Sequence, residues 1–178
     1  MGYCRRSCNG IAKRTVRLKF LRSELLYDIK NLAYVESDIM GEENQHAHHI
    51  TAEIGEEGNV DRVSRMLTVA HTAVTELLFP LTKQEPIEEE IDNILSIPDE
   101  YVVELDVPHD MSRTTVHLLA KLIHEYMVYK ALADWLSITD AQAAANWESK
   151  ADAAEVEISI LKNKSRHNGA FVRKSSPL

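Results

Sequence analysis

The chain has 178 residues, of which 44% are hydrophobic and 27% charged, and its formal net charge is −8. That length fits one domain with a single core that needs no disulfide or metal, and the composition excludes wholesale disorder. No run of about 18 apolar residues occurs, so we expect no transmembrane helix and no membrane partner. The basic N-terminus lacks the apolar block of a secretory signal, which indicates a chain that is not exported.

The charge is distributed unevenly along the sequence. Residues 1–22 hold seven Lys or Arg and no acid, and residues 162–178 hold five and again no acid. Residues 23–161 keep the other eight bases against all 28 acids, a balance of −20. Such basic ends usually reach an acidic partner, although two solvated tails would have the same composition. The residues that we expect to bind a partner are Arg5, Arg6, Arg14, Arg17, Arg166, Arg173 and Lys174.

Three regions follow from this pattern: a basic N-terminal arm (1–17), a helical domain (18–161) and a basic C-terminal tail (162–178). In the arm, Cys4 and Cys8 are expected to be free thiols, because a disulfide between them would close only a tiny loop. Their spacing, without a third Cys or a nearby His, makes a poor metal site.

Two helices are predicted in the first half of the domain, after an alternation that permits a short strand at 15–20. The first, from about Phe20 to Met40, repeats apolar residues at three to four positions: Leu18, Leu21, Leu25, Ile29, Leu32 and Val35 or Ile39. The second, from about Asn59 to Phe79, has a seam of Val60, Val63, Leu67, Ala70, Val74 and Leu77, and Pro80 ends it. Residues 41–58 between them read as a loop with a short helical insert.

A β-hairpin is predicted at about 91–107. Apolar and acidic residues alternate over 101–107, and Pro98-Asp-Glu100 has the composition of a turn, which gives strands at 91–97 and 101–107. Two strands alone are marginal in water, so this hairpin needs its own domain or a neighbouring subunit to pack against. The candidate acidic residues for a channel or interface are Glu88, Glu89, Glu90, Glu104 and Asp106.

The hydrophobic centre of the sequence is a pair of helices. Asp110 or Ser112 caps the first, which runs to about Leu136 and is apolar on most of its circumference, so we expect it to be buried. Thr139 with Gln142 forms a capping box for the second, an alanine-rich helix.

The joint at 137–139 is short, so the two helices must be antiparallel, and after Leu161 the helical pattern fails. The predicted fold class is mainly α: a helical bundle of about four long helices with an inserted β-hairpin, in the order α-α-β-β-α-α, and extended basic termini.

No catalytic signature occurs in the sequence, and we expect no enzyme and no cofactor. The trio His46, His48 and His49 is the best metal candidate, but no Cys stands nearby, so surface histidines are the preferred interpretation. His117 and His124 lie seven apart on one helix face and are interpreted as structural.

Four aromatic residues stand at helical spacing on the two central helices: Tyr126, Tyr129, Trp135 and Trp147. Such residues could line a cofactor pocket, but on apolar helices they are more often core or interface anchors.

One phrase in the central helices, Tyr129, Leu132, Ala133, Trp135 and Leu136 followed by a capped alanine-rich helix, resembles phage head-to-tail connector (adaptor) proteins. The stretches 14–40 and 59–79 also resemble proteins encoded near capsid and tail genes in Bacteroides-type prophages.

The resemblance implies a non-enzymatic structural protein of the virion neck, made in the host cytoplasm and assembled as a ring, commonly of about twelve copies, between portal and tail. Portal and tail or neck proteins would be its partners, and packaged DNA would pass through with transient contact. An acidic body suits such a channel, because like charges let DNA slide through without sticking. The alternative is a small helical regulatory or DNA-associated protein that binds phosphate with its basic ends.

Overall fold

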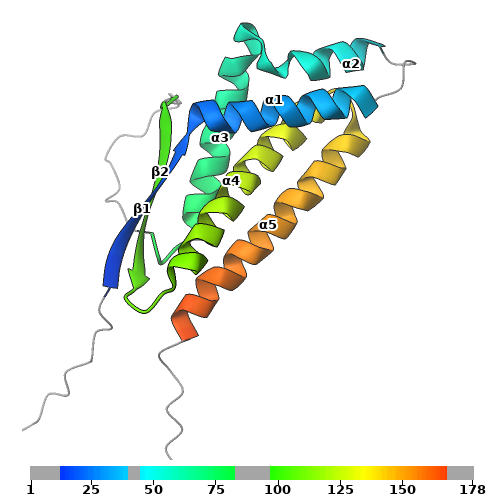
Figure 1. The fold of residues 1–178 in the computed structure, drawn as a ribbon. Helices are drawn as coiled ribbons and strands as arrows, with labels where there is room; N and C mark the ends of the chain where they lie inside the picture. The colour runs from blue at the N-terminus through cyan, green and yellow to red at the C-terminus, as the bar shows by residue number, and fades with distance from the viewer. Residues whose placement is uncertain (1–12, 40–44, 83–96, 168–178) are drawn as a thin grey trace, which may run out of the picture.

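The structure, a computed structural model, describes residues 13–39, 45–82 and 97–167. Within these ranges the chain is mainly helical with a two-stranded antiparallel sheet, which confirms the mainly α class. The helices are α1 (Arg22–Ile39), α2 (Gln45–Ala52), α3 (Glu57–Leu77), α4 (Arg113–Leu136) and α5 (Ala141–His167); a 3₁₀ turn (Glu53–Gly55) joins α2 to α3, and the strands are β1 (Lys13–Leu21) and β2 (Glu100–Pro108). Figure 1 shows α3, α4 and α5 side by side, with α1 crossing their upper end and α2 above α1.

The sheet corrects the predicted hairpin. Residues 101–107 do form a strand, but β2 pairs with β1, from Lys13 opposite Pro108 to Leu21 opposite Glu100. The alternation at 15–20 is therefore a true strand, and residues 13–17 belong to the folded domain rather than to an arm. Residues 91–96, most of the other predicted strand, lie outside the described residues.

The inner face of the sheet is apolar and packs against the helices. Six side chains on this face are buried: Leu18, Phe20, Tyr101, Val103, Leu105 and Val107. Tyr101 reaches α3, where its hydroxyl donates to the Ser64 carbonyl at 3.1 Å and its ring centre lies 5.3 Å from that of His71. The period-two pattern in each strand is explained by this single buried face.

His71 makes the stability of the fold depend on pH. Its Nε2 donates to the Val102 carbonyl at 3.0 Å, and burial lowers the pKa of the ring despite that hydrogen bond. In the unfolded chain a histidine pKa is about 6.5, so between the two pKa values the unfolded state binds more protons than the folded state. We therefore expect stability to fall as the pH drops below about 6.5.

Urea unfolding at pH 7.5 and at pH 5.5 measures this effect, with His71→Gln as the comparison because glutamine keeps a donor but does not titrate. The variant should lose less stability between the two pH values than the original chain. Equal losses in both proteins would assign the pH dependence to other groups.

Helix α4 lies at the centre of the fold and carries buried residues on every side, as its sequence predicts. Ser112 caps α4, because its hydroxyl oxygen accepts a hydrogen bond from the Thr114 amide at 3.1 Å. Of the two predicted caps, Asp110 and Ser112, the second is therefore the right one. The cap of α5 differs from the prediction. Asp140 Oδ1 accepts hydrogen bonds from the backbone amides of Gln142 and Ala143, at 2.9 and 3.0 Å. Asp140 rather than Thr139 therefore caps the first turn of α5.

The buried face of α1 and the end of α5 also differ from the expected ones. In α1 the buried row is Leu25, Ile29, Ala33 and Ser37, while Val35 and Ile39 are exposed. Ser37 can be buried because its hydroxyl donates to the Tyr34 carbonyl at 2.7 Å. Helix α5 continues past Leu161 to His167, so the first residues of the predicted basic tail are helical.

Candidate functional site

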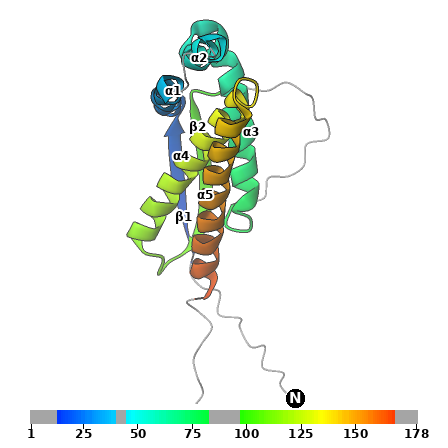
Figure 2. The same ribbon diagram turned by 90° about the vertical axis from the view of Figure 1, so that its right-hand side faces the viewer.

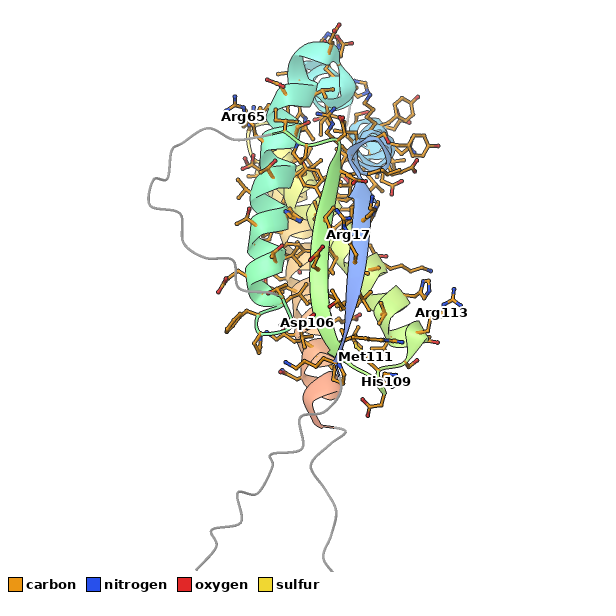
Figure 3. All side chains as sticks on the ribbon, turned by 90° about the vertical axis from the view of Figure 1, so that its left-hand side faces the viewer. Arg17, Arg65, Asp106, His109, Met111 and Arg113 are labelled. Atoms are coloured by element: carbon orange, nitrogen blue, oxygen red, sulfur yellow. The ribbon has the colours of Figure 1, made fainter. Side chains whose placement is uncertain are left out.

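The outward face of the sheet brings predicted basic and acidic partner residues together. Arg17 Nε lies 3.8 Å from Glu104, Lys19 Nζ lies 2.9 Å from Glu100, and the Thr15 hydroxyl donates to Asp106 at 2.8 Å. Figure 3 shows Arg17 and Asp106 on the two neighbouring strands. Arg17, predicted to bind a partner, and Glu104, predicted to lie at a channel or interface, contact each other within one chain.

We expect Lys19→Glu to cost about 0.5–1 kcal/mol of unfolding free energy, because it replaces the half-exposed Lys19–Glu100 ion pair, which joins diagonal positions of the two strands, with two like charges. The double variant Lys19→Glu with Glu100→Lys should recover most of that loss. Denaturant titration of the original chain, both single variants and the double variant measures the coupling. No recovery in the double variant would mean that the pair does not stabilise the sheet.

The remaining predicted partner residues have different positions. The Arg14 guanidinium donates to the Met111 carbonyl at 2.9 Å and so ties β1 to the segment before α4. Arg166 is in the last turn of α5, and its side chain is not described. The other predicted residues lie outside the described ranges: Arg5, Arg6, Glu88, Glu89, Glu90, Arg173 and Lys174.

The four aromatic residues are placed in the core or at its edge. Tyr126, Trp135 and Trp147 are buried, and Tyr129 is partly buried against the core. Trp147 joins three helices, because its ring centre lies 5.5 Å from that of Tyr129 and its Nε1 donates to Glu36 of α1 at 3.1 Å. These contacts make the aromatic residues internal anchors of the fold.

A groove lies beside α4, between α3 and α5. It has a volume of about 790 Å³. Its apolar lining comes from all three helices and includes Met66, Val69, Ala70, Ala73, Ala133 and Ala144. Helices α3 and α5 each pack on α4, and the small alanine side chains leave the space between them open. We call this feature the helix groove.

Charged side chains surround the apolar lining of the helix groove. Arg62 and Arg65 come from α3, and the Arg62 guanidinium lies 5.1 Å from the centre of the Trp135 ring. Lys130 on α4 forms ion pairs with Glu148 and Asp152 of α5. Burial alone would lower the pKa of Lys130, but the hydrogen bond to Glu148 and the nearby acids outweigh it and raise the pKa. Lys130 therefore stays protonated, and its charge is offset by the two acids it pairs with, whereas Arg62 and Arg65 supply further positive charge at the groove.

The histidines are dispersed over the structure. His48 is exposed, His49 Nε2 lies 2.9 Å from Glu53, and the His46 side chain is not described. His124 Nε2 lies 2.8 Å from Asp28 of α1, and His117 accepts from Arg113 Nε at 3.2 Å. Within 13–39, 45–82 and 97–167, no three His, Cys, Asp or Glu side chains lie close enough to hold a metal ion.

Comparisons with known proteins add no family, because no protein-family model, curated protein or solved structure matches the chain. In the part of the chain that the structure describes, every helix is too short or too polar to span a bilayer. The described part of the chain is a compact helical body with an open apolar surface.

The sequence reasoning did not identify the helix groove. It identified the buried seam of α3 but not the second apolar row beside that seam, Met66, Val69 and Ala73. That row repeats at three and four positions, which is the signal that a second face of the helix is available for packing.

Proposed function

We propose that the chain is a non-enzymatic structural subunit that assembles into the ring of a phage head-to-tail connector. The observation that carries this proposal is the helix groove, an apolar surface left open on a compact helical body. Folded monomers rarely expose large continuous apolar surfaces, and those that occur usually mark an interaction site. The resemblance of residues 129–136 and the alanine-rich helix to connector proteins gives the assembly its expected place, between portal and tail in the virion neck.

The charge of the chain is compatible with that place. Residues 23–161 have a balance of −20, and a body of that charge repels DNA phosphates, so that DNA passing through a ring is not retained. The alternative, a DNA-associated protein, needs free cations. Of the basic residues in β1, Arg17 and Lys19 are paired with acids, which leaves fewer charges for phosphate.

Mass photometry and negative-stain electron microscopy of the purified full chain, alone and with a portal protein, test the proposal. We expect closed rings in at least one of the two samples. A monomer in both samples would contradict it. Filter binding to DNA over a range of salt concentrations tests the alternative, because phosphate binding gives a steep fall of affinity with salt and a connector subunit gives little binding.

A further inference from the structure

Helix α1 carries an exposed aromatic stripe. Tyr27 and Tyr34 are each 62% exposed, a large fraction for two aromatic rings on one folded helix. Asn31 lies between them, and Glu24 and Asp38 lie at the two ends. The steps along this row are three and four residues, so the five side chains form one stripe along the helix. We call it the tyrosine ridge.

The tyrosine ridge and the helix groove are on opposite sides of α4. The surface of α4 toward α1 includes His124 and Val128, whereas the surface toward the helix groove includes Tyr126 and Lys130. His124 and Tyr126 are two residues apart, which corresponds to about 200° around a helix. Figures 2 and 3 show the same arrangement, with α1 on one side of the molecule and α3 on the other. A chain therefore cannot place its ridge in its own groove.

The two surfaces match in length. The ridge covers residues 24–38, which is about 21 Å of helix, and the α3 wall of the groove covers residues 62–73, which is about 17 Å. An α-helix laid in an apolar groove anchors itself through side chains at such three- and four-residue steps.

They also match in chemistry. Val69 is 60% exposed on the groove wall and offers the tyrosine rings an apolar contact. The charged residues that line the groove are three bases and two acids: Arg62, Arg65, Lys130, Asp134 and Glu148. The ridge acids Glu24 and Asp38 are opposite in sign to this excess of positive charge, which Arg62 and Arg65 supply from the α3 wall. Tyrosine and arginine are, with tryptophan, the residues enriched at the energetic centres of protein interfaces.

We propose that the tyrosine ridge of one copy binds in the helix groove of the next copy. The contact joins two different surfaces, so each bound copy still presents a free ridge at one side and a free groove at the other. Such head-to-tail contacts build rings when the rotation between copies closes, and filaments when it does not. This contact rests on the proposed function only because both require the chain to self-assemble.

Two variants that each destroy one surface test the contact. Tyr27→Lys with Tyr34→Lys removes the ridge and leaves the groove, and Val69→Glu with Ala73→Glu blocks the groove and leaves the ridge. All four positions are exposed, so both proteins should fold, which circular dichroism checks. At concentrations where the original chain assembles, each variant alone should be monomeric in sedimentation velocity. An equimolar mixture should form dimers with one copy of each variant and grow no further.

Val156→Lys is the matched control, because Val156 is exposed on α5 and belongs to neither surface. This variant should assemble like the original chain. Ridge variants that still assemble, or a mixture that stays monomeric, would overturn the ridge-in-groove contact. If rings form in the original chain and also in the ridge variant, the contact is wrong while the proposed function stands. An original chain that is monomeric alone and with a portal protein contradicts both.

Discussion

Deletion of residues 1–21 is expected to prevent cooperative folding. It removes β1, whose Leu18 and Phe20 are buried in the core, and it exposes the paired edge of β2. Truncating a buried Leu or Phe costs about 2–5 kcal/mol each. The two losses together approach the whole stability of a typical domain, about 5–15 kcal/mol. From the sequence, by contrast, residues 1–17 read as an arm outside the folded domain.

Far-UV circular dichroism during thermal unfolding measures the result. Deletion of residues 1–12 is the control, because it shortens the chain but keeps β1 whole. The control should keep a cooperative transition and the longer deletion should not. If both truncated proteins unfold at the temperature of the full chain, β1 contributes no stability and the sheet is not part of the core.

The pairing of β2 with β1 could not be predicted from the sequence. Alternation and a turn composition at Pro98-Asp-Glu100 favoured a local hairpin, since adjacent strands usually pair. In the structure Asp99 has another role, because its carbonyl accepts from the Arg22 amide at 2.9 Å and its carboxylate pairs with the Arg22 guanidinium at the same distance. Those contacts fix the end of β1 beside the start of β2. Pairing between strands this far apart in the sequence, residues 13–21 and 100–108, depends on tertiary contacts and not on local pattern.

The helices were predictable to the degree that their buried faces were unambiguous. Helix α4 is apolar all round, so its limits and its burial followed directly from its sequence. In α1 the predicted row is right at Leu25 and Ile29, which are buried, but wrong at its end, because Val35 and Ile39 are exposed. The row with Ala33 is buried because a small side chain lets the helix lie close to its neighbours. Residue size alone does not reveal which row is inside.

The candidate surfaces were also predictable only where a single segment forms them. Charge counting along the sequence directed attention to the ends of the chain, where Arg17 turned out to face Glu104. The helix groove was not visible in any single segment, because its walls come from α3 and α5 and its floor from α4. A surface that three separate helices create together can be predicted only when their packing is known.

Leu132→Ala is expected to lower the unfolding free energy by about 2–5 kcal/mol, because the side chain is fully buried at 0% exposure and its loss leaves a cavity. Leu118→Ala is the matched control on the same helix, with the same change in side chain and helix propensity at 44% exposure, and should cost less than about 1 kcal/mol.

Urea titration measures both variants, and Leu132→Ala should shift the midpoint without changing the slope, since the surface exposed on unfolding stays nearly the same. Equal losses at the two positions would show that α4 is not the centre of the core. Because α4 holds α1 on one side and forms the floor of the helix groove on the other, a cavity at Leu132 should also weaken the proposed ridge-in-groove contact. A variant that loses stability yet assembles with unchanged affinity would mean that the ridge and the groove are held in place without α4.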